Sequence, residues 1–382
     1  GWMRASLPPT AAGSALRPGS IVIETAEGDL RGKEIDIAPG AVQLGPMLGK
    51  GEDAIVRLRF TPEYSTQQAG LMAIYDADNY IRLGQHFKNR PMLEFGFEWK
   101  GIYEQPLSLY LYDPFGQLGR SRWLSLRRDG NRYASYTSEN GFAWTPFGNP
   151  VTMPDRADDP HVAIYAFNGR SSSLPARAEF DQLGAGIAFH HRQEGPFRPA
   201  PSDSWQQRVD CENGMSTVVE GGTLQLVFAP GSIGCNWDLL HAAPPGDWAI
   251  SALIDFEPAA GSSFGLMVRG TQSFIALTRR DLDGRSIQLE RRDDRDTRID
   301  DFLGYPPVLL RLEKRGAVIR GSVSRDFEKF VPLPAEAPVE ELGKIRSLGV
   351  AGSVAHWTGE GGRPAARVYW IRLETLNTNP LP

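Results

Sequence analysis

The sequence of 382 residues has little cysteine, little excess charge and no long apolar run. Its net charge is −5, with basic and acidic residues mixed along the chain. We expect no nucleic-acid partner, because phosphates are bound by a basic stripe that this mixture does not provide. No apolar run approaches the roughly 20 residues that a membrane-spanning helix needs, so no membrane span is expected either.

The two cysteines, Cys211 and Cys235, lie early in the second half of the chain. Their spacing permits a disulfide, and it also fits two unrelated buried thiols. Disulfides persist in oxidising compartments, so the pair slightly favours a secreted or periplasmic protein over a cytoplasmic one.

Helical periodicity and common catalytic motifs are also scarce. No long segment repeats apolar residues every 3.6 positions, and the best helix candidate is the short segment Val339–Leu342. The six histidines lack a metal-binding spacing such as H-E-x-x-H. Residues 261–265 fit G-x-S-x-G, but they lead into a predicted strand where a nucleophile elbow needs a following helix, so we interpret them as a turn.

Glycine and proline are abundant, at 41 and 29 residues, and they separate short segments with strand character. Residues 54–60 and 107–112 alternate apolar and polar side chains, and residues 21–23 are β-branched. Period-two alternation with frequent turns is typical of antiparallel sheets. The sequence therefore predicts an all-β protein built from antiparallel β-sandwiches.

Two parts of the chain resemble each other at a separation of 195 positions, counted from Gly70 to Gly265. Each begins Gly-Leu-Met and continues into an Ile-x-Leu segment, and two later blocks recur in the same order: 124–130 as 310–316, and 176–180 as 366–370. A repeat of this period indicates tandem domains and not a solenoid. We predict a loose lead-in at 1–19, a first sandwich at 20–188, a linker at 189–203 and a second sandwich at 204–382.

One predicted hairpin carries a distinctive polar face. Asn79–Phe87 and 93–100 flank a turn at 88–91, and both segments alternate. Bringing their apolar sides together predicts a register with these opposed pairs: His86 with Glu94, Gly84 with Gly96, and Arg82 with Glu98.

This register would place a glycine-floored trough between two polar pairs, where a flat ligand could approach the backbone. Arg82 and Glu98 are candidates to hold sugar hydroxyls by charge-assisted hydrogen bonds. Further candidates for sugar binding or stacking are Tyr75, Asp76, Tyr80 and Tyr103. The alternative is a solvated face with ordinary cross-strand ion pairs.

The second half lacks this pattern. Its matching strand has Ala276 in place of Arg82, and Thr278 where the first half has Gly84. We therefore expect a single site in the first half, with the second half as a support.

A catalytic role for the same face stays open, with Glu94, Glu98 and His86 as the candidate residues. Two residues four apart on one strand lie about 13 Å apart, whereas paired glycosidase carboxyls need roughly 5–9.5 Å. Glu94 and Glu98 therefore cannot act directly as acid and nucleophile. Glu94 with His86, or either glutamate with Asp76, remains an acid–base alternative.

The segment 68–84 resembles the concanavalin A-like domain that follows the propeller in family 43 β-xylosidases, and also related laminin-G-like domains. The hairpin at 136–144 and the strand at 177–183 extend the resemblance across the first half. It implies a two-sheet jelly roll, often with a structural Ca²⁺ and often involved with carbohydrate. Separately, the acidic residues Asp181 and Asp36 are candidate ligands for a Ca²⁺ ion. The catalytic propeller of those enzymes has no room in this chain.

We therefore predict two tandem concanavalin A-like jelly-roll sandwiches. The leading hypothesis is recognition of an oligosaccharide or polysaccharide on the concave face of the first sandwich, with no required cofactor. The alternatives are a glycoside hydrolase or lyase acting at that face, and a structural or adaptor protein.

Overall fold

The computed structural model describes residues 21–25, 27–28, 42–76, 78–88, 90–110, 121–154, 156, 158–169, 174–190, 192, 195–196, 204–210, 215–228, 233–257, 262–280, 286–291, 297–299, 307–327, 329–356 and 365–376. Within these ranges the chain is mostly β-strand, in antiparallel sheets. The one helical element among them is a 3₁₀ turn, η2 (Val339–Leu342), at the position of the sequence's best helix candidate. The predicted all-β, antiparallel fold class is confirmed.

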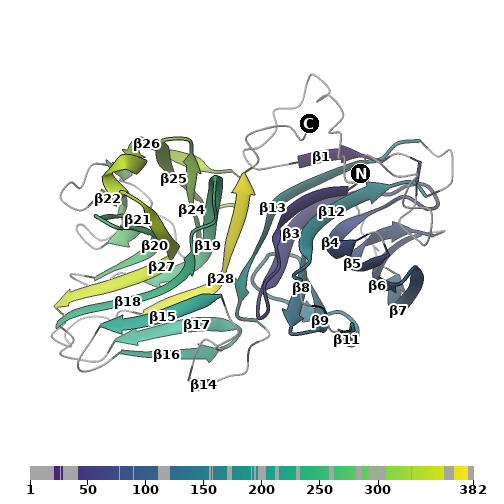
Figure 1. Cartoon of the computed structure of the whole chain (residues 1–382), viewed down its shortest axis with the longest axis horizontal. Coiled ribbons are helices and arrows are strands. Elements are labelled where there is room, and N and C mark those ends of the chain that lie inside the picture. Colours follow the sequence, from purple (N-terminus) through teal and green to yellow (C-terminus); the bar gives the residue numbers. More distant parts are fainter. Residues whose placement is uncertain are drawn as a thin grey trace. The chain divides into compact units, whose positions relative to one another are not determined.

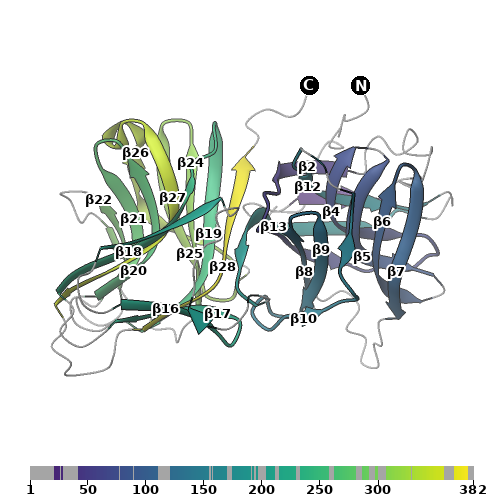
Figure 2. The ribbon, with the colours of Figure 1, turned by 60° about the horizontal axis from the view of Figure 1, so that its bottom comes forward.

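The chain divides into two compact units, residues 1–186 with 377–382, and residues 187–376. Each unit contains two antiparallel sheets (Figures 1 and 2). Buried apolar side chains form a separate core in each unit. The two units are described separately.

The first unit contains a six-stranded sheet whose strands follow one another in the order β2, β12, β4, β5, β6, β7. Figure 2 shows β5, β6 and β7 side by side. The bounds are β2 (Val42–Met47), β12 (His161–Phe167), β4 (Gln68–Asp76), β5 (Asn79–Phe87), β6 (Pro91–Trp99) and β7 (Ile102–Tyr110).

The opposite sheet of this unit runs β1, β13, β3, β8, β9, and two short strands pair with β9. Their bounds are β1 (Ile21–Glu24), β13 (Arg177–Ala188), β3 (Asp53–Phe60), β8 (Arg122–Asp129), β9 (Arg132–Ser138), β10 (Thr145–Pro146) and β11 (Val151–Thr152).

The second unit has the same two-sheet plan. One sheet comprises β14 (Gly195–Pro196), β16 (Met215–Glu220), β17 (Thr223–Phe228), β28 (Ala365–Leu376), β19 (Asp247–Glu257), β24 (Val308–Arg315), β25 (Val318–Ser324) and β26 (Val331–Pro338). The other comprises β15 (Trp205–Asp210), β18 (Ile233–Ala242), β27 (Ile345–His356), β20 (Ser262–Gly270), β21 (Phe274–Arg280), β22 (Ser286–Arg291) and β23 (Thr297–Ile299).

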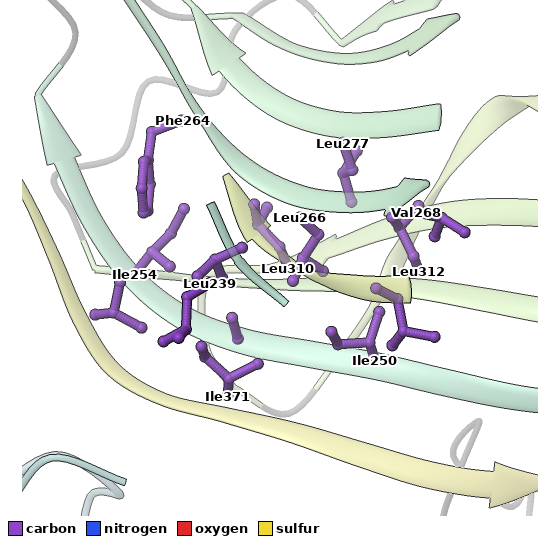
Figure 3. Packing of buried hydrophobic residues seen from close by; sticks show 14 of the residues in the cluster. Leu239, Ile250, Ile254, Phe264, Leu266, Val268, Leu277, Leu310, Leu312 and Ile371 are labelled. Atoms are coloured by element: carbon purple, nitrogen blue, oxygen red, sulfur yellow. The ribbon is translucent and has the colours of Figure 1, made fainter. Parts of the chain in front are cut away.

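Alternation along the strands places the apolar side chains of both sheets between them. In the second unit Leu239, Leu266 and Leu277 come from one sheet and meet Ile250 and Leu310 of the other (Figure 3). In the first unit Leu71, Leu83 and Phe95 fill the corresponding space. Full burial of such a side chain contributes about 1.5–3 kcal/mol, so these faces hold the two sheets of each unit together.

The register of the β5–β6 hairpin differs from the predicted one by two residues. His86 lies opposite Met92, Gly84 opposite Glu94, Arg82 opposite Gly96 and Tyr80 opposite Glu98. The face assignment was right and the register was wrong, because alternation is preserved when a strand slides by two positions. Pro91 is already the first residue of β6, opposite Phe87, which shortens the loop to residues 88–90. A proline fits that first strand position, where its missing N–H costs least.

Candidate functional site

The six-stranded sheet of the first unit has one face that points away from the main core of that unit. This face is called here the outer face, and its side chains are arranged in regular rows. Three successive rows cross β12, β4, β5 and β6. The first row is Tyr165, Gly70, Gly84 and Glu94; the second is Ala163, Met72, Arg82 and Gly96; the third is His161, Ile74, Tyr80 and Glu98, with Tyr103 of β7 beside Glu98.

The glycines of the outer face do not leave an open trough, so this part of the prediction was wrong. A Cβ added to Gly84 would lie 2.4 Å from the hydroxyl oxygen of Tyr165. A Cβ added to Gly96 would lie 2.2 Å from the hydroxyl oxygen of Tyr103. The missing side chains therefore make room for two tyrosines, Tyr165 of β12 and Tyr103 of β7, whose rings both lie near Arg82.

Arg82 is the centre of the cluster. Its Nη2 donates to Oε1 of Glu94 at 2.5 Å, and its Nε donates to the hydroxyl of Tyr103 at 3.0 Å. Its guanidinium carbon lies 4.6 Å from the ring centroid of Tyr103 and 5.8 Å from that of Tyr165. The cation is thus held by one carboxylate and lies within the range of cation–π attraction to two rings.

Glu94 accepts from three side chains at once. Besides Arg82, the Tyr103 hydroxyl donates to its Oε1 at 2.5 Å, and Nδ1 of His86 lies 3.1 Å from its Oε2. Burial alone would raise the pKa of Glu94. The Arg82 charge and the hydrogen bonds of His86 and Tyr103 outweigh burial and hold that pKa well below its usual range.

The second carboxylate, Glu98, belongs to a separate part of the cluster. The hydroxyl of Tyr80 donates to its Oε2 at 2.8 Å, and both side chains are fully buried. Burial raises the pKa of Tyr80 far above its usual value, and the nearby Glu98 acts in the same direction although Arg82 opposes it. Tyr80 therefore stays a neutral donor. The predicted contact of Arg82 with Glu98 is replaced by Arg82 with Glu94.

Two predicted sugar-binding residues lie outside this cluster. Tyr75 packs against the main core, and its hydroxyl is 2.7 Å from that of Tyr133. Asp76 forms an ion pair with Arg156 at 3.0 Å and accepts from the amide of Asn79. The pairing of β4 with β5 shifts between Ile74 and Asp76, and this irregularity separates the end of β4 from the rows described above.

Of the two proposed calcium ligands, Asp181 alone lies among the described residues. Both carboxylate oxygens of Asp181 accept from Arg57, each at 2.6 Å, in a buried pair. A calcium ion bound by Asp181 would have to displace that guanidinium. Asp36 lies outside the described residues, and the described residues contain no cluster of three or more His, Cys, Asp or Glu able to hold a metal.

Sequence reasoning missed Tyr165 and the small apolar cluster around it. The members of that cluster are Met72, Ile74, Tyr80, Ala163, Tyr165 and Phe167. Tyr165 is about 80 positions away from the hairpin in the chain, so no local pattern links it to Gly84. The only signal was the pair of opposed glycines, Gly70 and Gly84, which leave the space that a ring from the next strand fills.

One donor of the cluster has no acceptor. Nη1 of Arg82 is buried and has no hydrogen-bond partner among the described residues. An unpaired buried donor costs about 1–3 kcal/mol, and more when the group is charged. The nearest members with some solvent exposure are His86, whose side chain is 13% exposed, and the half-buried Tyr103.

The same face of the second unit is built differently. Thr278 lies opposite Gly265, as Gly84 lies opposite Gly70, and the Thr278 hydroxyl donates to Glu290 at 2.5 Å. Ala276, one row away, stands where the first unit has Arg82. The arginine-centred cluster therefore belongs to the first unit.

Two further expectations concern location. The predicted Cys211–Cys235 pair includes Cys211, which lies outside the described residues. No helix in the described ranges has the length and hydropathy needed to cross a bilayer.

The sequence matches no known family profile and no curated protein. Among solved structures, similar ones include a protein of unknown function from Saccharomyces cerevisiae (18% identity, TM-score 0.38, covering 47% of this chain and 92% of that one). Others are the GH43 protein BlXynB from Bacillus licheniformis (13%, TM-score 0.38, 80% and 64%) and a Lotus tetragonolobus seed lectin (9%, TM-score 0.37, 51% and 100%).

The xylosidase and lectin neighbours contain concanavalin A-like sandwiches, the fold expected from the sequence. The matched region spans 64% of the length of the GH43 protein. At these identities and TM-scores the likeness concerns fold alone, and neither ligand nor activity is carried over to this chain.

Proposed function

We propose that the first unit recognises a saccharide at its outer face, with Arg82 as the central donor. The observation that carries the proposal is the unpaired Nη1 of Arg82 near two tyrosine rings. Saccharide sites combine the same two elements, aromatic surface for the apolar faces of the sugar and charge-assisted donors for its hydroxyl oxygens. A hydroxyl oxygen that accepts from Nη1 would remove the cost of leaving it unpaired.

The ligand reaches Arg82 past His86 and Tyr103, the two members of the cluster that retain exposure. Tyr80 and Glu98 lie fully buried in the third row, next to the row of Arg82, and help to hold the cluster in place. The ring of Tyr165 also lies near the guanidinium. In this view the glutamates orient donors, and the ligand contacts the arginine and the half-buried side chains.

Recognition is favoured over proton-transfer catalysis by the state of Glu94. A general acid must be protonated near the working pH, whereas Arg82, His86 and Tyr103 keep Glu94 ionised. Its two oxygens are also occupied by those three side chains. We therefore do not assign bond cleavage to this face.

The test is calorimetric titration of the full chain with neutral oligosaccharides, such as xylo-, manno-, galacto- and gluco-oligosaccharides, after a glycan-array screen. Replacing Tyr103→Phe removes one hydroxyl bonded to two charged groups, worth about 1.5–3 kcal/mol per bond. We expect roughly a tenfold or greater loss of affinity. His86→Ala is expected to weaken binding as well.

Tyr136→Phe is the matched control, because it removes a hydroxyl from β9 in the opposite sheet of the same unit. Its affinity should equal that of the unaltered protein. The proposal fails if no saccharide binds, or if Tyr103→Phe and Tyr136→Phe bind a saccharide equally well.

The proposal needs no metal, and a structural Ca²⁺ elsewhere in the first unit stays a separate hypothesis. It is tested by comparing the unfolding midpoint in CaCl₂ and in EDTA. We place the protein outside the cytoplasm as part of the same proposal. Thiol titration of the denatured protein tests this, because a Cys211–Cys235 disulfide would leave no reactive thiol.

A further inference from the structure

The outer face is almost closed to solvent around Arg82, and this limits which part of a saccharide can reach it. The Arg82 side chain is 0% exposed, and its row neighbours Met72 and Ala163 are fully buried as well. All residues of the first row are buried, and so are the residues that β4, β5 and β6 contribute to the third row. Arg82 is therefore surrounded by buried residues within the rows.

A polysaccharide bound along its length requires a different surface. Such a chain lies across several side chains at once, with its sugar units stacked on exposed aromatic rings. The rings that the three rows could offer are those of Tyr165 and Tyr80, and these residues are only 2% and 0% exposed. A chain laid across the rows would therefore find no exposed ring among them.

The partly exposed members of the cluster lie toward one edge of the sheet and along β5. Tyr103 is half-buried and comes from β7, beyond β6, whereas His86 is 13% exposed and comes from β5 itself. In the opposite direction, toward β4 and β12, the row of Arg82 continues into the buried Met72 and Ala163. A ligand that approaches past Tyr103 and His86 thus meets buried side chains beyond Arg82.

This arrangement distinguishes the two kinds of sugar unit in a chain. An internal unit is linked to a neighbour on each side, so its binding at Nη1 of Arg82 would require the chain to leave in two directions. A terminal unit is linked at one point and can be inserted while the rest of the chain stays in solvent. The single unpaired N–H at Nη1 needs one acceptor, which a hydroxyl or ring oxygen of that unit provides.

Resting on the saccharide-binding function proposed above, we infer that the outer face binds the terminal unit of a saccharide chain and does not bind internal units. Arg82 donates to an oxygen of the terminal unit, and Tyr103 and His86 flank its point of entry. Short oligosaccharides and the ends of polysaccharides are then equivalent ligands.

The experiment exploits the fact that cleaving a polymer multiplies its ends without changing its mass. Each neutral series used above is offered to the full chain as the tetrasaccharide, as the soluble linear polymer, and as that polymer after partial acid hydrolysis. Calorimetry measures the protein bound per gram of saccharide, and a reducing-sugar assay counts the chains. We expect the amount bound per gram to rise in proportion to the number of chains, with one protein molecule per chain at every length.

The affinity per chain gives a second measure. It should agree between the tetrasaccharide and the polymer to within about twofold. Binding to internal units would instead make a chain with about ten times as many positions bind about tenfold more tightly, which corresponds to 1.4 kcal/mol.

Two variants connect this behaviour to the outer face. Tyr103→Phe should weaken the binding of tetrasaccharide and polymer by the same factor, and the matched control Tyr136→Phe should change neither. A capacity per gram that hydrolysis leaves unchanged, or a polymer affinity that Tyr103→Phe leaves unchanged while tetrasaccharide binding weakens, overturns this inference and leaves saccharide recognition standing. Absence of binding for every series overturns the proposed function itself. If Tyr103→Phe does not fold, the hydrolysis comparison on the unaltered protein still decides.

Discussion

The contact between Gly96 and Tyr103 gives a quantitative test of how the outer face is built. In Gly96→Ala the new Cβ would lie 2.2 Å from the hydroxyl oxygen and 2.7 Å from Cζ of Tyr103. Real Cβ contacts are not that short, so the ring must move by about 1 Å, a displacement of the kind that overpacking forces on neighbours. It would then lose its alignment with Arg82 Nε and Glu94 Oε1, which it contacts at 3.0 and 2.5 Å.

The cost follows from those two bonds. A hydrogen bond to a charged group contributes about 1.5–3 kcal/mol, and moving the ring weakens both. We expect Gly96→Ala to lower the free energy of unfolding of the first unit by about 3 kcal/mol. In a Tyr103→Ala background the nearest remaining atom outside the substituted side chain is the carbonyl oxygen of Glu104, at 3.1 Å. There the same substitution should cost less than about 1 kcal/mol, because only a small adjustment is needed.

The double-mutant cycle therefore has an expected coupling energy of about 2 kcal/mol between positions 96 and 103. Urea unfolding followed by tryptophan fluorescence measures each variant. Hydrogen exchange of the β6 amides assigns the transition to the first unit, which is necessary because a two-unit chain need not unfold in one step. Equal costs of Gly96→Ala in both backgrounds would refute the placement of Tyr103 above the glycine.

Three further outcomes are expected from buried charges. Asp181→Asn should lower the free energy of unfolding by about 3–5 kcal/mol, because it removes the carboxylate of the buried ion pair with Arg57. Replacing Arg57 by Met and Asp181 by Leu together should lower it by less than Asp181→Asn alone. A larger loss in the double variant would contradict this reasoning. The pKa of Glu94 is lower in the folded protein than in the unfolded chain, so ionised Glu94 stabilises the folded state fully above about pH 5 and less as the pH falls further. The urea midpoints measured at pH 6 and at pH 3 should therefore differ less in Glu94→Gln than in the unaltered protein. Glu374→Gln should destabilise the second unit strongly, because two buried guanidiniums share that carboxylate, and unchanged urea unfolding would exclude such a role.

The sequence was sufficient to predict the fold class and which residues of the β5–β6 hairpin share the outer face. Alternation decides which residues share a face, and it placed Tyr80, Arg82 and Gly84 on one face of their strand and Glu94 and Glu98 on one face of the next, as the structure has them. It could not decide the register within the hairpin, because every slide by two positions satisfies the same alternation. The length of the turn decided it, and that depended on whether Pro91 belongs to the turn or to the strand.

The trough could not be judged from the hairpin alone. A glycine on a sheet face indicates that something approaches the backbone closely, but a ligand and a side chain of the protein give the same signal. Here the occupants are Tyr103, seven positions after Gly96, and Tyr165, on a strand that the sequence places far from the hairpin. Only the order of strands in the sheet, with β12 beside β4 and β7 beside β6, brings these rings over the glycines.

This arrangement explains why the first and second units differ together at several positions of the corresponding face. Where the first unit has Gly84, the second has Thr278, and where the first has Arg82, the second has Ala276. The position of Tyr165, opposite Gly70, corresponds to Ala351, opposite Gly265. The cation, the glycine and the ring are absent together, as expected if each requires the others: the ring needs the glycine for space, and the buried cation needs the ring and a carboxylate to offset its desolvation.

Introducing arginine alone at position 276 should therefore destabilise the second unit and create no site there, and restoring stability should require a glycine at 278 and a tyrosine at 351 as well. Urea unfolding of the single and triple variants measures this, and a single arginine variant as stable as the unaltered protein would show that the three features are independent.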